Sequence, residues 1–173
     1  MTNGGQSLDY IEVVGKGKTF TKPAAPFIAI PTTSGTGSEA TRNAVLTHRE
    51  SKTKASLRSR YLLPTLALLD PTLTHTLSPA VTASTGLDAL TQLIEPFTSR
   101  RAFPLIEGIA LAGMKLAASA LPVAFEEPDN AGARSDMMQA SLAGGMSLAH
   151  AGLGAVHAFA APLGGSFPIP HGF

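Results

Sequence analysis

The chain has 173 residues, a formal net charge of +1 and a charged fraction of 14%, well below the roughly 25% of typical soluble domains. It contains no cysteine, which excludes a disulfide framework, a thiolate metal site and a cysteine nucleophile. The nearly balanced charge argues against binding nucleic acid through bulk electrostatics, and the 44% hydrophobic content argues against intrinsic disorder.

The first 75 residues are predicted to consist mainly of strands and loops. A short apolar strand over 26–30 precedes a loop rich in glycine and hydroxyl side chains. Two strands over 44–47 and 54–59 flank a polar turn and predict a hairpin, and 65–69 is a further apolar strand. This part is too small to form a doubly wound sheet alone.

The pattern then changes to helices. A helix begins at Ser78-Pro79 and is predicted to stop at Pro96, because proline cannot donate the next helical hydrogen bond. Helical spacing of apolar residues continues over 103–121, 136–148 and 153–163, with two glycines beyond the last helix. The sequence therefore predicts an α+β chain with a boundary near residues 75–78.

The last 37 residues carry no Lys, Arg, Asp or Glu. They are long enough for a membrane helix, which needs about 20 apolar residues. Polar side chains and prolines interrupt them, so we predict buried soluble core and no membrane segment. The polar N-terminal residues 1–7 lack the pattern of a signal peptide, and we therefore expect a cytoplasmic protein.

The loop over 32–39 follows directly after the first strand. Its glycines would let the backbone approach a ligand, and its hydroxyls and N–H groups could donate to phosphate or ribose oxygens. A tight structural turn is the alternative, because such turns are common. The loop is neither a Walker loop nor a GxGxxG fingerprint.

Asp88 and Gln92 are four residues apart on one predicted helix face, among apolar neighbours. A carboxylate there needs a partner, either an arginine, a helix cap or a metal ion. His157 and His171 lie in the segment without charges, as hydrogen-bonded core residues or as metal ligands. Imidazole nitrogen and carboxylate oxygen are ligands that divalent transition metals accept.

Six basic residues lie between positions 42 and 60, opposed by a single acidic residue. Aromatic side chains that could stack on bases are absent from this stretch. It is therefore predicted to be a solvated hairpin and not a nucleic-acid surface, with Lys54 as the residue that could face a ligand.

Taken together, five motifs resemble the iron-containing (group III) alcohol dehydrogenase family, which includes maleylacetate and lactaldehyde reductases. The motifs extend over nearly the whole chain, in the family's order and spacing. They are Pro31-Thr32-Thr33-Ser34-Gly35-Thr36-Gly37-Ser38-Glu39, Asp70-Pro71-x-Leu73-Thr74, Thr85-Gly86-Leu87-Asp88-Ala89-Leu90-Thr91, Gly152-Leu153-Gly154-Ala155-Val156-His157, and Pro162-Leu163-Gly164-Gly165 with Pro170-His171-Gly172.

The resemblance implies an oxidoreductase that transfers hydride between NAD or NADP and an alcohol, aldehyde or ketone, with Fe(II) or Zn(II) as Lewis acid. It implies a two-domain fold: residues 1–77 as the end of an α/β dinucleotide-binding domain and 78–173 as the start of an all-helical metal domain. By position, Asp88, Gln92, His157 and His171 match the metal ligands. The positions matching the cofactor site are Thr32, Thr33, Gly35, Thr36, Gly37, Thr41, Asn43, Lys54 and Leu73.

Two positions depart from better-known members. Gln92 replaces a histidine ligand, and Ala161 replaces a histidine that often lies close to the substrate. Members are roughly twice as long, and the loop that receives the cofactor pyrophosphate is expected upstream. The chain is therefore expected to be a fragment of a homo-oligomeric enzyme. The alternative is an inactive truncated chain that folds or acts only with other subunits.

Overall fold

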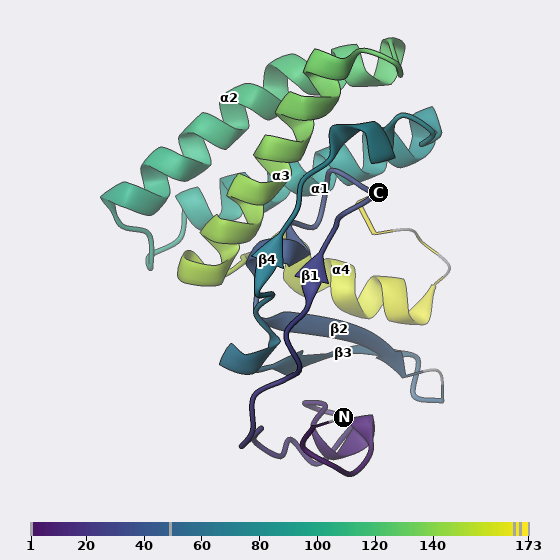
Figure 1. The fold of residues 1–173 in the computed structure, drawn as a ribbon, viewed down its shortest axis with the longest axis vertical. Coiled ribbons are helices and arrows are strands. Elements are labelled where there is room, and N and C mark those ends of the chain that lie inside the picture. Colours follow the sequence, from purple (N-terminus) through teal and green to yellow (C-terminus); the bar gives the residue numbers. More distant parts are fainter. Residues whose placement is uncertain (1, 49, 168, 170, 173) are drawn as a thin grey trace.

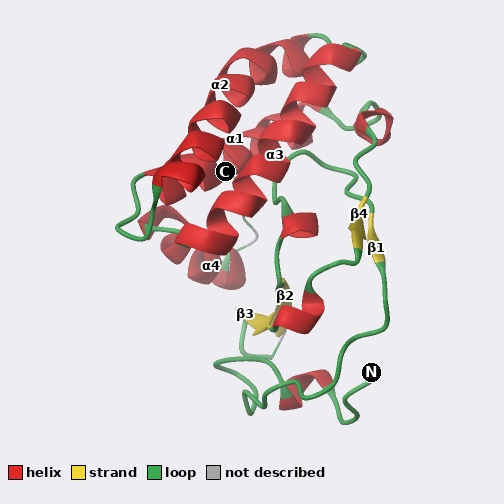
Figure 2. Cartoon of the chain, turned by 60° about the vertical axis from the view of Figure 1, so that its left-hand side comes forward, coloured by secondary structure: helices red, strands yellow, loops and turns green. Residues whose placement is uncertain are grey.

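The computed structural model describes residues 2–48, 50–167, 169 and 171–172. Three long helices lie together at one end of the molecule, and the N-terminal residues lie at the other end (Figure 1). Short strands and loops connect the two ends, as the colouring by secondary structure makes plain (Figure 2). The mixed α and β composition confirms the predicted fold class.

The strands form two small sheets. β1 (Ile28–Ala29) pairs in parallel with β4 (Leu66–Ala67), and β2 (Asn43–His48) pairs antiparallel with β3 (Thr53–Arg58). The predicted hairpin is confirmed, in a register that places Asn43 opposite Arg58. β1 and β4 are two residues long, shorter than the apolar runs that predict them.

The helices are α1 (Pro79–Phe97), α2 (Pro104–Glu126), α3 (Ala131–Ala151) and α4 (Ala155–Ser166). Ser78 caps α1 by accepting from the Val81 N–H, and Asn130 caps α3 by accepting from the Ala133 N–H. Such caps satisfy backbone donors that have no partner within the helix.

The main core lies between α1, α2 and α3, and most of its side chains are small. Small residues let helix axes approach closely, so that the backbones and β-carbons make the contact. The fully or almost fully buried members are Ala89, Leu93, Ala110, Ala117, Ala120, Ala124, Ala133, Met137 and Ala140. A second cluster, around Tyr10 and Ile11, packs the N-terminal segment against β3.

Within the described residues, α2 alone is long and apolar enough to cross a membrane by length and composition, with a mean hydropathy of 1.6. Its alanine-rich face packs against α1 and α3, whereas Leu105, Leu111 and Phe125 are exposed. Part of the apolar character of α2 is therefore explained by the face that packs into the helical core.

The helices extend beyond several of their predicted ends: α2 and α3 are longer than the predicted 103–121 and 136–148, and the predicted stops at Pro96 and before Gly164 are wrong. α1 continues through Pro96, because the φ of proline suits a helix and only the bond to the Gln92 carbonyl is lost in this last turn. α4 continues through Gly164 and Gly165 because it packs against the hairpin. A β-carbon on Gly165 would lie 2.3 Å from the Lys52 carbonyl oxygen, so only glycine allows this approach.

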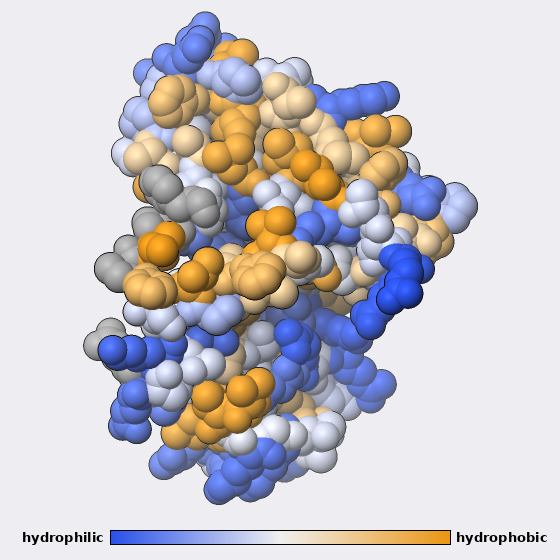
Figure 3. All heavy atoms as spheres, turned by 180° about the vertical axis from the view of Figure 1, so that it is seen from behind, coloured by the Kyte–Doolittle hydropathy of each residue, from blue (hydrophilic) through white to orange (hydrophobic). Residues whose placement is uncertain are grey.

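The prediction that the whole uncharged tail is buried is correct for α3 and wrong for α4. Eight residues in the part of α3 that belongs to the tail are buried, but none of α4 is. Apolar side chains form a band over α4 on the far side of the molecule from the view of Figure 1 (Figure 3). Val156, Phe159 and Leu163 are exposed there, because no described element covers this face of α4.

Candidate metal and cofactor site

A cavity of about 770 Å³ extends from the β2–β3 hairpin to α1 and α4. Hydroxyl and amide side chains of Thr36, Ser38, Thr41 and Asn43 line one part of it, and Lys54 adds a cation. Asp88, Gln92, His157 and His171 line the other part. The cavity therefore joins residues predicted to bind a cofactor with residues predicted to bind a metal.

The loop over 32–39 is fixed by the helices behind it. Gly37 has φ +56°, and its N–H donates to Ser141 Oγ on α3 at 3.2 Å. A β-carbon on Gly145 would lie 2.1 Å from the Gly37 carbonyl oxygen, so loop and helix touch through their backbones. The loop is thus held rigidly at the edge of the cavity by a contact that requires glycine on both sides.

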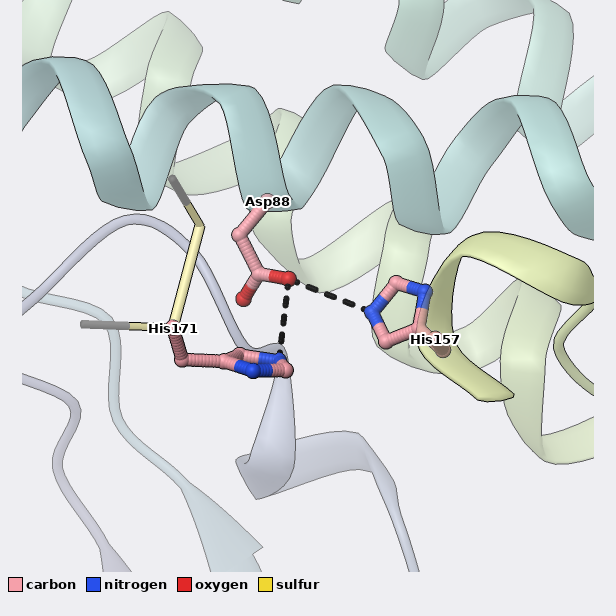
Figure 4. A group of neighbouring side chains, drawn as sticks. All are labelled: Asp88, His157 and His171. Atoms are coloured by element: carbon pink, nitrogen blue, oxygen red, sulfur yellow. Dashed lines mark hydrogen bonds and ion pairs between the residues drawn. The ribbon is translucent and has the colours of Figure 1, made fainter. Parts of the chain in front are cut away.

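Three side chains from separate elements converge at the end of the cavity (Figure 4). Asp88 comes from α1, His157 from α4, and His171 from the C-terminal segment, and one potential ligand atom of each lies within 4.8 Å of the others. Asp88 Oδ1 is 3.2 Å from His157 Nε2 and 3.4 Å from His171 Nε2. A buried carboxylate facing two imidazoles is a donor set that suits a divalent transition metal.

Gln92 lies one helical turn after Asp88 and is buried. Its Nε2 donates to the Gly35 carbonyl oxygen at 2.7 Å and lies 3.5 Å from Asp88 Oδ2. Because the amide nitrogen is engaged with the loop, the carbonyl oxygen of Gln92 is the atom left to act as a ligand.

Glu95 was missed as a site residue in the sequence, although it follows Asp88 by seven positions on the same helix face. His157 Nδ1 donates to Glu95 Oε2 at 2.6 Å. Burial lowers the pKa of His157, but hydrogen bonds to Asp88 and Glu95 outweigh it and raise the pKa. Burial raises the pKa of Glu95, but the Gly154 and Val156 N–H groups and His157 lower it overall.

The residues predicted to bind the cofactor are only partly brought together. Thr36, Thr41, Asn43 and Lys54 line the cavity. The Lys54 ammonium group lies close to the backbone of α4, because a β-carbon on Gly164 would be only 2.8 Å from Lys54 Nζ. The remaining five lie outside its lining: Thr32 is exposed, Thr33 is half-buried, Gly35 packs against Thr85, Gly37 packs against α3, and Leu73 is exposed in a short 3-10 helix.

Glu39 is buried beside this loop, in the short 3-10 helix Ser38–Ala40. Neither carboxylate oxygen has a hydrogen-bond partner among the described residues, and burial raises the pKa of Glu39. A carboxyl group with a raised folded-state pKa contributes stability at low pH that is lost as pH rises through the folded-state pKa. Ionised Glu39 therefore destabilises the chain at neutral pH.

We expect Glu39→Gln to raise the free energy of unfolding at pH 7 by about 1–2 kcal/mol, since an unpaired buried charge is removed. The gain should shrink towards pH 4, where wild-type Glu39 is protonated. Urea unfolding at both pH values measures the difference, with Glu126→Gln on the exposed end of α2 as the control. A loss of stability at pH 7 would show that the carboxylate has a partner.

Comparison with known families gives a decisive match. Residues 1–71 match the family model for iron-containing alcohol dehydrogenase, and residues 82–173 match the model for the C-terminal part of the Fe-containing alcohol dehydrogenase family. The second match alone covers more than half of the chain. The chain belongs to the iron-containing alcohol dehydrogenase family. The resemblance inferred from the five motifs is thereby confirmed.

Individual members of this family agree with the assignment. Alcohol dehydrogenase 4 of Saccharomyces cerevisiae is 42% identical over 99% of this chain and 44% of its own length. The long-chain-alcohol dehydrogenase 1 of Geobacillus thermodenitrificans is also 42% identical, over 97% of this chain and 42% of its own. The chain thus spans less than half the length of these two relatives.

Solved structures of the family share the fold. The sulfoacetaldehyde reductase from Bifidobacterium kashiwanohense, in complex with NAD+, superposes with a TM-score of 0.92 at 38% identity. The match covers 99% of this chain and 45% of that chain. A 1,3-propanediol oxidoreductase gives a TM-score of 0.86 at 42% identity, covering 90% of this chain and 41% of that one.

Proposed function

We propose that this chain supplies the metal ligands and the nicotinamide side of the cofactor cleft of an NAD(P)-linked oxidoreductase that interconverts an alcohol and an aldehyde or ketone. One observation carries the proposal: Asp88, His157 and His171, from three separate elements, meet within 4.8 Å at the end of a cavity lined by hydroxyl and amide side chains. Such a cleft suits a reaction between a polar cofactor and a small substrate.

The donor set fits a resident Fe(II) or Zn(II) ion. Asp88 would supply an anionic oxygen, His157 and His171 neutral nitrogens, and Gln92 a neutral amide oxygen. When bound, the ion would supply Lewis-acid polarisation of the substrate oxygen. The weaker fourth donor, Gln92, makes the choice between Fe(II) and Zn(II) sensitive to this position.

The chain's own residues have two further roles in this proposal. Thr36, Thr41 and Asn43 would hydrogen-bond the cofactor, and Lys54 would pair with its phosphate or ribose oxygens. Leu148 and Leu153 line the cavity near the ligands and would exclude water from the reacting atoms. Ala161 also lines the cavity, and its methyl side chain cannot relay a proton. The proton of the substrate hydroxyl would therefore have to pass to solvent or to another group of the substrate.

Relatives support the substrate class. They are an alcohol dehydrogenase, a long-chain-alcohol dehydrogenase, a 1,3-propanediol oxidoreductase and a sulfoacetaldehyde reductase bound to NAD+. We accordingly propose that the substrate is a small-molecule alcohol or carbonyl compound, and that the cofactor is NAD, with NADP as the alternative. We also propose that residues 1–77 belong to a nucleotide-binding part and residues 78–173 to a helical metal-binding part. A cytoplasmic location and homo-oligomeric assembly complete the proposal.

The cofactor half of the proposal is tested by titrating the 173-residue chain with NADH and following nicotinamide fluorescence. We expect saturable binding, weakened about tenfold to a hundredfold by Lys54→Ala, since hydrogen bonds to charged groups contribute about 1.5–3 kcal/mol. Lys22→Ala, at an exposed lysine outside the cavity, is the matched control. Absence of saturable binding in the wild-type chain would support the alternative of an inactive chain instead.

A further inference from the structure

Glu95 is a buried acid that contacts His157, one of the proposed metal ligands. It lies two helical turns after Asp88 on α1, and its residue is 8% exposed. Seven residues in a helix return to nearly the same face, so both carboxylates point towards α4. Asp88 faces the Nε2 atom of His157, and Glu95 faces the Nδ1 atom of the same ring.

The second contact of Glu95 is with the start of α4. Glu95 Oε1 accepts from the Val156 N–H at 2.7 Å, and the nearby Gly154 N–H helps to lower the pKa of this carboxylate. The N-cap residue of α4, Gly154, has no side chain to make this bond. Glu95 therefore caps α4 from a neighbouring helix, at the positive end of the helix dipole.

These two contacts together determine how His157 is presented. A carboxylate oxygen only accepts hydrogen bonds, so His157 Nδ1 must carry a proton. Nε2 also faces a carboxylate, Asp88 Oδ1, but at 3.2 Å against 2.6 Å for Nδ1 and Glu95. In the neutral ring the shorter bond keeps the proton on Nδ1, and the lone pair lies on Nε2, beside His171. The cap holds the backbone of residue 156, and the bond to Nδ1 holds the ring, which together leave His157 little freedom to turn away.

We propose that Glu95 is a positioning residue of the metal site, which fixes the Nδ1-protonated tautomer of His157 and the start of α4 so that Nε2 is directed to the metal. The inference rests on the metal site of the proposed function. A purely structural role for Glu95, as a helix cap that has no effect on the ligand, is the competing interpretation.

Glu95→Gln separates the two interpretations, because the amide keeps the shape but has one acceptor oxygen and replaces the second acceptor oxygen by an NH₂ donor. Its NH₂ group can turn to donate to Nδ1, which favours the tautomer with the proton on Nε2 and blocks ligation. We expect the dissociation constant for Zn(II), measured by chelator competition, to rise about tenfold to a hundredfold. The Co(II) absorption spectrum should change as well.

Glu107→Gln, at an exposed position on α2, is the matched control and should leave both readouts unchanged. If Glu95 is only a helix cap, Glu95→Gln should lower the melting temperature without metal. The folded variant should then keep the wild-type Zn(II) affinity and the wild-type Co(II) spectrum. That result would overturn the inference and leave the proposed function intact.

Nitrogen-15 NMR of the histidine rings, recorded without metal at a pH where the rings are neutral, tests the tautomer directly. We expect the Nδ1-protonated form of His157 in wild type and a shift towards the other tautomer in Glu95→Gln. If the wild-type chain binds neither Zn(II) nor Co(II), the proposed metal site fails, and the NMR result alone decides the role of Glu95. A wild-type Nε2-protonated ring would refute it.

Discussion

Asp88→Ala is expected to reduce the Zn(II) affinity of the chain by roughly a hundredfold or more. A four-ligand structural zinc site binds with about 10–16 kcal/mol, so that one ligand contributes about 3 kcal/mol. Each 1.4 kcal/mol is a factor of ten in affinity. Asp88 contributes the only negative charge among the four proposed ligands, so its removal should be more damaging than that of a neutral ligand.

The effect on stability without metal should be much smaller. Asp88 is 6% exposed, and its carboxylate lies 3.2 Å from His157 Nε2 and 3.4 Å from His171 Nε2, so its removal takes away one buried carboxylate and also the partner of a buried imidazole. We therefore expect Asp88→Ala to melt only slightly below the wild-type temperature without metal. With Zn(II) at a hundred times its dissociation constant, the wild type gains about 2.7 kcal/mol, and the variant should gain almost nothing.

Metal content by elemental analysis and melting curves with and without Zn(II) measure both effects. Asp88→Asn keeps the shape and one oxygen donor, and should fall between wild type and alanine. Asp129→Ala, at an exposed aspartate between α2 and α3, is the control. Undiminished metal content and an undiminished metal-induced rise in melting temperature for Asp88→Ala would contradict the assignment of the ligands.

The sequence predicts those parts of the fold and site that depend on local periodicity. The spacing of Asp88 and Gln92 places both on one face of a helix, and the hairpin follows from two short strands around a polar turn. The motifs also identify His157 and His171 through the family resemblance. Each of these inferences needs only a few neighbouring residues or a known pattern.

The parts that escaped prediction depend on contacts between distant segments. In the sequence, Glu95 is an ordinary residue near a helix end; its role follows from α4, about sixty positions later, which places the Val156 N–H and the His157 imidazole against it. By helix propensity alone, Gly145 is an unfavourable residue; the structure shows that the Gly37 carbonyl packs against it and leaves no room for a side chain. Tertiary contacts, and not propensity, give both residues their meaning.

The exposed face of α4 has the same explanation. An apolar composition predicts burial only if some element covers it, and composition does not say which element does so. Val156, Phe159 and Leu163 lie at helical spacing on a face that no described element covers. The position of α4 is instead determined from its other side, by Glu95 and by the hairpin strand β3.

Gln92→His is the second substitution with a large expected effect, and it should increase metal affinity. Imidazole nitrogen is a better donor than a neutral amide oxygen for Zn(II), Co(II) and Ni(II), so we expect tighter Zn(II) binding on the order of tenfold to a hundredfold. The new ring can keep the contact with the loop, because its second nitrogen can donate to the Gly35 carbonyl as Gln92 Nε2 does.

Three variants separate the two roles of Gln92, ligand and loop anchor. Gln92→His should tighten Zn(II) binding, whereas Gln92→Leu should weaken it and also leave the buried Gly35 carbonyl without its donor, at a cost of about 1–3 kcal/mol in stability. Gln139→His, at an exposed glutamine of α3, adds an imidazole away from the site and should change neither quantity. Chelator competition and urea unfolding measure the two effects.

The outcome also bears on which metal the site prefers. A neutral oxygen at position 92 lowers the preference for metals that favour nitrogen donors, and a histidine there restores it. If Gln92→His leaves the affinities for Zn(II) and Ni(II) unchanged, Gln92 does not face the ion, and its only role is to hold the loop through Gly35. Asp88, His157 and His171 would then be the whole protein contribution to the site, leaving an open position for the substrate oxygen.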